Sequence, residues 1–326
     1  MLAPKLREPP LAPVNVAPFE LSGATMGTTW RLRAFAPPGF NAKRLDAEIA
    51  AVLAAVVGEM SAWEPRSALS RFNALEAGHA LALPGRMRRV LEEALSIAAE
   101  TDGAFDPSIG ALVDAWGFGA LAPAFDKPGD DVIDAALESA GWRKLAFASD
   151  ALVQPGGLRL DLNGIAKGYA VDVAAEIAAA AGLTSYLMEI GGELRAAGIK
   201  PDGQPWWVEL ERPPRAPGER LLLALYNQAV ATSGDYIRRD IVDGEEIAHT
   251  IDPFTGRPLR KGVAAVSVLH ASCMRADAYA TALTVMGVEA GLAFAARAEI
   301  AAIIAERRDG ALIEHFSPRA TEMLAD

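Results

Sequence analysis

Apolar residues recur at helical spacing along much of the chain. The clearest case lies over residues 41–60, where residues such as Leu45 and Ile49 fall on one face and charged side chains mostly on the other. The Asp-Pro pair at residues 106–107 predicts a helix start, because Asp is favoured at the cap and Pro at the first helical position. Further helices are predicted over residues 85–101, 131–140, 274–286 and 288–298. Another helix is predicted to begin within the segment 160–172 and to end at about Ala181.

Short apolar or alternating runs bounded by turn residues predict β-strands. Residues 19–36 alternate around a turn over Ser22–Gly27, and the runs at 144–148, 151–154 and 158–162 are separated by turns, as in an antiparallel sheet. Further strands are expected over residues 185–190, 193–199, 206–211, 221–226, 229–233, 246–251, 263–269, 300–305 and 311–316. The segments lack regular β-α-β alternation, so the sequence predicts an α+β class with mixed, mostly antiparallel sheets and packed helices.

We expect a single domain over residues 19–326, preceded by a proline-rich tail over residues 1–18 that is expected to lack fixed structure. Residues 212–217, which are rich in proline, are expected to form an exposed loop. The start of the chain has neither the apolar run nor the small-residue cleavage site of an export signal. As written, the chain is therefore expected to be cytoplasmic and to have no membrane segment.

Composition excludes several classes of partner and site. The 326 residues carry 31 basic and 42 acidic side chains, a formal charge of −11, and no basic block that resembles a nucleic-acid or lipid-headgroup footprint. The sole cysteine, Cys273, excludes an intramolecular disulfide, and no Cys/His cluster has the spacing of a zinc site. Nucleic-acid binding is therefore not expected.

Residues 160–172 combine a strand end, a glycine turn and a helix start. Asp161 and Asn163 offer side-chain oxygens, Gly164 permits backbone conformations closed to other residues, and Lys167 lies in the first helical turn, where the helix dipole favours an anion. The segment is therefore either a phosphate site or simply a well-capped strand–turn–helix junction.

A second candidate is the helix that carries Asp277 and Thr281, which are four residues apart and so share one face. A carboxylate and a hydroxyl beside phosphate oxygens suit magnesium better than zinc. Alternatively, Thr281 bonds back to the helix backbone and Asp277 caps the helix.

A third candidate is His249, which is followed by Thr250, Asp252 and a Pro/Gly turn. In this polar setting an imidazole can orient or deprotonate a hydroxyl near neutral pH, although a lone histidine is more often structural. Trp63 lies in a polar loop after the first helix, where it either closes the core or stacks on a planar ligand.

Taken together, these segments resemble the FAD:protein FMN transferases, the ApbE family of flavin transferases. The resemblance rests on ordered motifs between about residues 22 and 287. They are residues 23–28, 60–61 with 70–73, 105–108 with 116–118, 160–172, 189–193, 232–236, 249–258 and 277–281. The resemblance implies a T-fold-related α+β domain that contains a flavin transferase site.

The resemblance implies an enzyme that uses Mg²⁺ to cleave FAD. It would transfer FMN to a Thr or Ser hydroxyl of a partner flavoprotein with a Ser/Thr-Gly-Ala-Ser/Thr type motif, and release AMP. The implied metal ligands are Asp277, Thr281 and the backbone carbonyl of Gly164. The implied FAD-lining residues are Met26, Trp63, Asp106, Lys167, Glu189, Thr232, Ser233, His249, Ile251 and Asp252.

Several alternatives follow from the same residues. His249 is the first candidate for the base that activates the acceptor hydroxyl, and Asp277 is the second. A metal-dependent FAD diphosphatase would use the same site with water as the acceptor, and a flavin-binding protein would use it without turnover. The aromatic Trp63 favours transfer, because the resemblance ties hydrolysis to a polar residue there. Family members are often periplasmic or membrane-anchored, so the compartment stays open.

Overall fold

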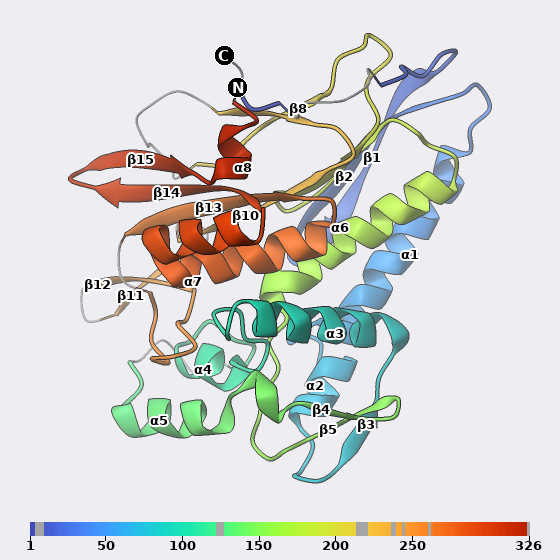
Figure 1. Ribbon diagram of the computed structural model, residues 1–326. Coiled ribbons are helices and arrows are strands. Elements are labelled where there is room, and N and C mark those ends of the chain that lie inside the picture. The colour runs from blue at the N-terminus through green and yellow to red at the C-terminus, as the bar shows by residue number, and fades with distance from the viewer. Residues whose placement is uncertain are drawn as a thin grey trace.

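An eight-stranded antiparallel sheet forms the centre of the protein, which we describe from a computed structural model (Figure 1). The structure describes residues 1–3, 10–121, 127–212, 221–235, 239–242, 245–259 and 262–324. In spatial order the strands are β1 (Ala17–Thr25), β2 (Thr28–Ala36), β6 (Tyr186–Ile190), β7 (Glu193–Ala197), β10 (Ala229–Gly234), β13 (Val263–His270), β14 (Ala301–Arg308) and β15 (Ala311–Phe316). The predicted α+β class with mostly antiparallel sheets is confirmed.

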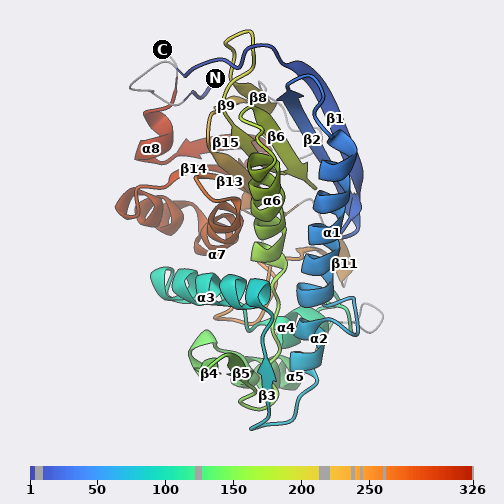
Figure 2. The ribbon, with the colours of Figure 1, turned by 90° about the vertical axis from the view of Figure 1, so that its right-hand side faces the viewer.

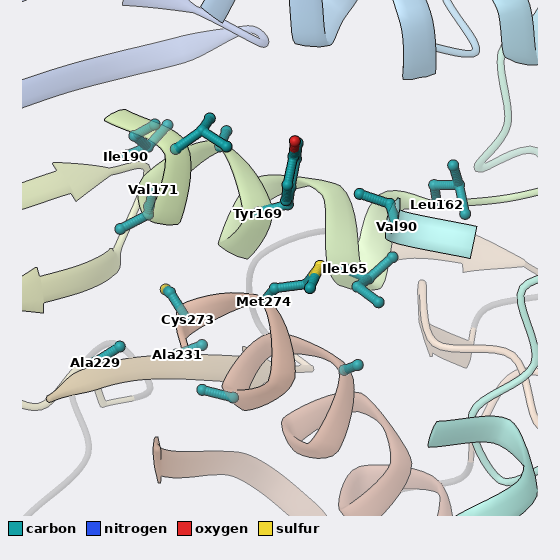
Figure 3. Close-up of a cluster of buried hydrophobic side chains, with 14 of the residues drawn as sticks. Val90, Leu162, Ile165, Tyr169, Val171, Ile190, Ala229, Ala231, Cys273 and Met274 are labelled. Carbon is teal, nitrogen blue, oxygen red and sulfur yellow. The ribbon is translucent and has the colours of Figure 1, made fainter. Parts of the chain in front are cut away.

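Three long helices cover one face of this sheet: α1 (Ala42–Met60), α6 (Asn163–Ala180) and α7 (Cys273–Arg297) (Figures 1 and 2). The largest core fills the space between them and the sheet (Figure 3). Tyr169 and Ile165 of α6, Met274 of α7 and Ala231 of β10 all contribute to it. Burial of this apolar surface is the main force that holds helices and sheet together.

The other face of the sheet has a core of its own. Strand side chains alternate between faces, so Met188 of β6 belongs to the helix-side core while its neighbour Leu187 points into this second core. The hairpin β8 (Trp206–Glu209) and β9 (Leu222–Leu225) covers this face together with α8 (Pro318–Thr321). The sheet is thus buried on both sides.

A smaller region lies beyond the long helices, at the bottom of Figure 1. It contains α2 (Ala68–Asn73), β3 (Ala80–Ala82), α3 (Gly85–Glu100), α4 (Gly110–Ala115), α5 (Asp130–Ser139), the 3-10 turn η1 (Trp142–Lys144), β4 (Ala146–Ala148) and β5 (Ala151–Val153). The three strands pair antiparallel in the order β3-β5-β4. A separate hairpin, β11 (Arg239–Val242) and β12 (Glu245–Ala248), precedes His249.

Local predictions differ from the structure at three places. The first turn is confined to Met26 and Gly27, because Ser22 to Thr25 pair with β2 as the end of β1. Asp106 does not cap a helix: its carboxylate accepts from the Ser108 backbone N–H, and α4 begins only at Gly110. Residues 158–162, predicted as a strand, form only a single parallel bridge to Ile109.

The break predicted at Gly287 is present within α7. Gly287 has φ 78° and ψ −175°, so the helix kinks there although its two parts follow each other directly. Of the helices in the described residues, α7 is long and apolar enough to cross a membrane by length and composition. It packs against α6 and the sheet, however, with Asp277, Tyr279 and Leu283 buried, as expected of a core helix.

The beginning of the chain is part of the fold. Leu2 is fully buried, its backbone N–H donates to Leu222 O and its carbonyl accepts from Ala224 N. The tail predicted over residues 1–18 therefore does not include residues 1–3, which are part of the fold, or residues 17–18, which begin β1. Residues 4–9, and all but Arg212 of the predicted loop over 212–217, lie outside the described residues.

Candidate active site

The start of α6 lies directly against the middle of α7, and glycine makes this contact possible. A Cβ placed on Gly164 would lie 2.9 Å from the Thr281 hydroxyl oxygen. One turn later, a Cβ on Gly168 would lie 2.4 Å from the carbonyl oxygen of Cys273 and 2.8 Å from the Asp277 Cβ. Two of the three residues expected to bind metal, Gly164 and Thr281, are therefore in direct contact.

Asp277 completes this group. Its Oδ2 accepts a hydrogen bond of 2.9 Å from the backbone N–H of Gly168. Burial raises the pKa of Asp277 to about 6, and the nearby Lys167 ammonium opposes this rise. A buried carboxylate of this kind gains from a cation beside it.

Lys167 joins α6 to the central sheet through an ion pair with Glu193 at the start of β7. Its Nζ lies 2.7 Å from Glu193 Oε1. Burial alone would lower the pKa of Lys167, but the charges of Glu193 and Asp277 outweigh it and raise this pKa. Burial raises the pKa of Glu193 to about 8, against the pull of Lys167. The ammonium therefore lies between two buried acids.

Sequence reasoning missed Glu193 and chose Glu189 of the same motif instead. Glu193 is buried, and its Oε2 has no hydrogen-bond partner among the described residues. Glu189, in contrast, lies on β6 opposite Arg31 and is only half-buried. Glu193 occupies the first position of β7, directly after two glycines with positive φ, and this position was the signal that could have identified it.

The chain offers the donor set that a magnesium ion prefers. The Gly164 carbonyl, the Asp277 carboxylate and the Thr281 hydroxyl are hard oxygen ligands, and the absence of a side chain at Gly164 leaves the space in front of Thr281 open. Within the described ranges, no group of three or more His, Cys, Asp or Glu side chains converges. The donor set is thus one carboxylate supplemented by neutral oxygens, which fits magnesium better than zinc.

Two further segments approach this group. A Cβ on Gly191 would lie 2.9 Å from a methyl of Thr28 and 3.5 Å from Cδ of Lys167, which places the Met26–Gly27 turn near Lys167. Met26 itself has φ 50°. On the other side, the ring of Phe105 would lie 3.4 Å from a Cβ on Gly164, so the residue before Asp106 also borders the start of α6.

Asp106 and Asp252 are both predicted to line the FAD pocket. The carboxylate of Asp252 bonds within its own loop, whereas that of Asp106 bonds to its own loop and to the start of η1. Asp106 accepts from the backbone N–H of Ser108 at 2.8 Å and from that of Trp142 at 3.2 Å. Asp252 accepts from the backbone N–H of Phe254 at 2.8 Å and from the hydroxyl of Thr255 at 3.0 Å. Burial raises the pKa of Asp106, although its hydrogen bonds oppose this shift. Both residues therefore shape the loops in which they lie.

The loop that carries His249 is held against α4. Trp116, at the end of α4, donates from its indole N–H to the carbonyl of Gly256 at 2.7 Å. The ring of Phe118 meets the half-buried ring of His249 edge-on, with centroids 6.4 Å apart. Ile251 is buried and forms a bridge with Pro258. The structure thus fixes the backbone on both sides of Asp252.

The remaining predicted residues lie at different depths. Trp63, in the loop after α1, leaves 48% of its surface exposed, and its backbone N–H donates to Ser61 Oγ. Thr232 shares a hydrogen bond of 2.8 Å with Ser267 across β10 and β13. Ser233 follows on β10, a strand that packs against α7. The contacts described here unite Gly164, Lys167, Asp277 and Thr281 directly, and place the other predicted residues on loops and strand ends.

Comparisons with known proteins identify the family of this chain. The model of the ApbE family matches residues 26–304. An FAD:protein FMN transferase of Vibrio cholerae serotype O1 is 38% identical over 91% of this chain and 90% of its own length. The enzyme of the same name from Escherichia coli K12 is 33% identical over 82% of this chain and 78% of its own.

Solved structures give the same result. The apo form of Pseudomonas stutzeri flavinyl transferase ApbE superposes with a TM-score of 0.88 at 36% identity, covering 94% of this chain and 97% of that one. The flavin transferase ApbE from Vibrio cholerae has a TM-score of 0.87 at 36% identity, covering 95% of this chain and all of the other. Fold, sequence and the order of the motifs coincide, and the chain belongs to the ApbE family of flavin transferases.

Proposed function

We propose that this protein transfers FMN from FAD to a Ser or Thr hydroxyl of a partner flavoprotein, with Mg²⁺ as cofactor and AMP as the second product. Membership of the ApbE family and the curated FAD:protein FMN transferases among its relatives support this activity. The observation that carries the finer proposal is the contact between Gly164 of α6 and Thr281 of α7, next to the buried Asp277.

The residues at this contact suit a diphosphate. The ammonium of Lys167 would bind phosphate oxygens, and the dipole at the start of α6 would add positive potential. Glu193 would hold Lys167 in place through the 2.7 Å contact between Lys167 Nζ and Glu193 Oε1. A magnesium ion bound by the Gly164 carbonyl, Asp277 and Thr281 would neutralise the diphosphate and polarise the phosphorus under attack.

The proposed reaction exchanges one phosphorus–oxygen bond for another. The acceptor hydroxyl oxygen forms a bond to the phosphorus of the FMN half, the bond from that phosphorus to the bridging oxygen breaks, and AMP leaves with the bridging oxygen. The hydroxyl proton passes to a base, for which His249 is the first candidate and Asp277 the second. Phe118 and the Asp252 turn hold the His249 segment in position.

The isoalloxazine end is assigned to the exposed loops. Trp63 offers a half-exposed aromatic face on which a planar ring can stack. The segments around Asp106 and Asp252 are fixed by their own hydrogen bonds, so their backbone groups are pre-organised for a ligand. Thr232 and Ser233 supply hydroxyls from β10.

Product analysis tests this proposal. The purified protein is incubated with FAD and Mg²⁺, with and without a peptide that contains a Ser-Gly-Ala-Thr sequence. We expect AMP and a peptide heavier by one FMN, and no adduct when the Thr of the peptide is replaced by Ala. Release of AMP and free FMN at the same rate with and without peptide would show a diphosphatase instead. FAD binding with no product under any condition would show a flavin-binding protein.

A further inference from the structure

Helices α6 and α7 run antiparallel and meet along a ladder of matched positions. Asp172 lies opposite Cys273, Gly168 opposite Asp277, and Gly164 opposite Thr281. Each step is four residues on both helices, so the contacting residues of each helix form one stripe. The candidate metal ligands occupy the lower two steps, and Asp172 occupies the step above them.

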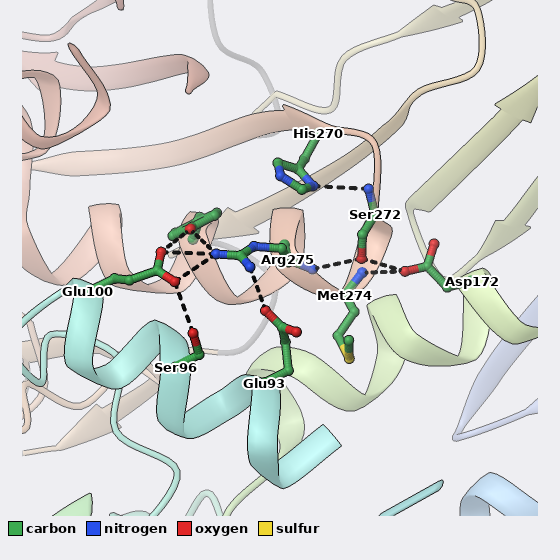
Figure 4. A network of polar contacts seen from close by, with 9 residues as sticks. Glu93, Ser96, Glu100, Asp172, His270, Ser272, Met274 and Arg275 are labelled. Carbon is green, nitrogen blue, oxygen red and sulfur yellow. Dashed lines mark hydrogen bonds and ion pairs between the residues drawn. The ribbon is translucent and has the colours of Figure 1, made fainter. Parts of the chain in front are cut away.

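The upper step is a dense set of hydrogen bonds to one buried carboxylate (Figure 4). Asp172 accepts from the Ser272 hydroxyl at 2.7 Å, from Cys273 N at 2.9 Å and from Met274 N at 3.0 Å. Arg195 of β7 adds an ion pair of 2.6 Å. Backbone N–H groups at the start of a helix have no partner within the helix. Here Asp172 of α6 is the acceptor for the first N–H groups of α7.

The lower steps leave no room for an alternative register. At Gly168 a Cβ would collide with backbone atoms of Cys273, and the Gly168 N–H is already bonded to Asp277. Neighbouring positions on a helix are rotated by about 100°, so a slip of one residue would turn Asp277 and Thr281 away from Gly164. The register of α7 against α6 therefore decides whether Asp277 and Thr281 lie against the start of α6.

We propose that Asp172 is a positioning residue for the active site: it fixes the first turn of α7 and so sets the register that places Asp277 opposite Gly168 and Thr281 opposite Gly164. The proposal rests on the proposed function, because it assigns the purpose of this register to magnesium and diphosphate binding. Asp172 itself touches neither. An asparagine at this position would present an N–H₂ group to donors that now all bind carboxylate oxygens.

A second anchor on α7 provides a matched control. Arg275 forms ion pairs of 2.7 Å with Glu93 and 2.8 Å with Glu100 of α3, and Tyr279 also donates to Glu100 (Figure 4). Residues 275 and 279 are rotated by about 200° from 277 and 281, so this network holds the opposite side of the helix. Its side chains tie α7 to α3, and only the backbone N–H of Arg275 meets the upper step, by donating to the Ser272 hydroxyl.

The experiment compares Asp172→Asn with Glu100→Gln in the full-length, FAD-bound protein. Magnesium binding is measured by calorimetry, and exchange of the Gly168 amide proton is measured by NMR or mass spectrometry. We expect Asp172→Asn to weaken magnesium binding about 10-fold or more, as loss of a supporting contact to a metal ligand commonly does, and to accelerate exchange at Gly168. We expect Glu100→Gln to lower Tm while both readouts stay at wild-type values.

If Asp172→Asn does not fold, Ser272→Ala is used instead, because it removes one hydrogen bond from Asp172 together with the cap bond from Arg275 N. Like Asp172→Asn, this variant is expected to weaken magnesium binding, by about threefold. Unchanged magnesium binding and Gly168 exchange in the folded Asp172 or Ser272 variant would overturn the inference, as would an equal loss in Glu100→Gln at the same drop in Tm. Wild-type protein that binds no magnesium would instead refute the proposed metal requirement.

Discussion

The α6–α7 contact and the loops around it are built in opposite ways. At the contact, Gly164, Gly168 and Asp277 are held by helix backbone and by a buried ion pair beside them. In the loops, Trp63 is half exposed, and the Asp252 carboxylate accepts hydrogen bonds from its own turn. The α6–α7 contact therefore tolerates almost no change in shape, whereas the loops are stabilised by their own turns and are exposed to solvent.

This difference matches the two halves of the proposed substrate. A diphosphate with a metal ion requires charged groups at fixed short distances, which rigid and buried elements provide best. A flavin ring requires an aromatic face and a few backbone groups, which loops on a rigid scaffold can present. Variants in the buried contact should therefore affect the chemical step, and variants in the loops should affect FAD affinity.

The strongest test removes the carboxylate from the buried contact. Asp277→Ala is expected to lower transfer activity by about 10³-fold, because the site loses its only charged metal ligand. Glu289→Ala, which removes an exposed carboxylate from the same helix, is expected to remain at the wild-type rate. Steady-state rates of AMP release, with circular dichroism to confirm folding, measure both. A fully active Asp277→Ala protein would refute the metal assignment.

The loop side is tested by Trp63→Ala. Loss of ring stacking is expected to raise the Kd for FAD about 10-fold, while Tm changes little because the side chain is half exposed. Trp207→Ala is the matched control, since Trp207 is also exposed but lies on β8, in the hairpin on the opposite face of the sheet. Fluorescence titration with FAD measures both variants. Equal losses of affinity in the two would remove Trp63 from the flavin site.

The smallest expected effect concerns pH and Glu193. Its folded-state pKa, about 8, lies above the ordinary value of 4.5, because burial favours the protonated form. Its contribution to stability is therefore fully present below about pH 4.5 and lost as pH rises through about 8. Asp277, with a pKa raised to about 6, contributes in the same direction.

Glu193→Gln keeps the shape of the protonated acid and cannot ionise. Without FAD or magnesium, wild-type protein is expected to lose at least about 1 kcal/mol more unfolding free energy between pH 5 and pH 8 than this variant does. Urea unfolding at several pH values measures the difference. Parallel curves for the two proteins would show that Glu193 stays ionised in the folded state.

Much of the fold follows from local patterns in the sequence. The apolar spacing of α1 identified its bounds within one residue, and Asn41 caps the helix. The strands predicted over residues 300–305 and 311–316 correspond to β14 and β15, and the boundary predicted between residues 286 and 288 is the kink in α7. These features depend on residues close together in the chain, where period and turn chemistry act directly. The order of motifs likewise identified the family, which the comparisons confirm.

The sequence could not show how residues far apart in the chain are used. Asp106 has the sequence context of a helix cap but binds its own loop and the start of η1. Asp172 has the context of an ordinary helix residue but accepts hydrogen bonds from the start of α7, a hundred residues later. The sequence by itself determined the elements, the family and most candidate residues. Only the tertiary structure determined that two glycines let α6 and α7 touch, because a close approach depends on which backbones meet.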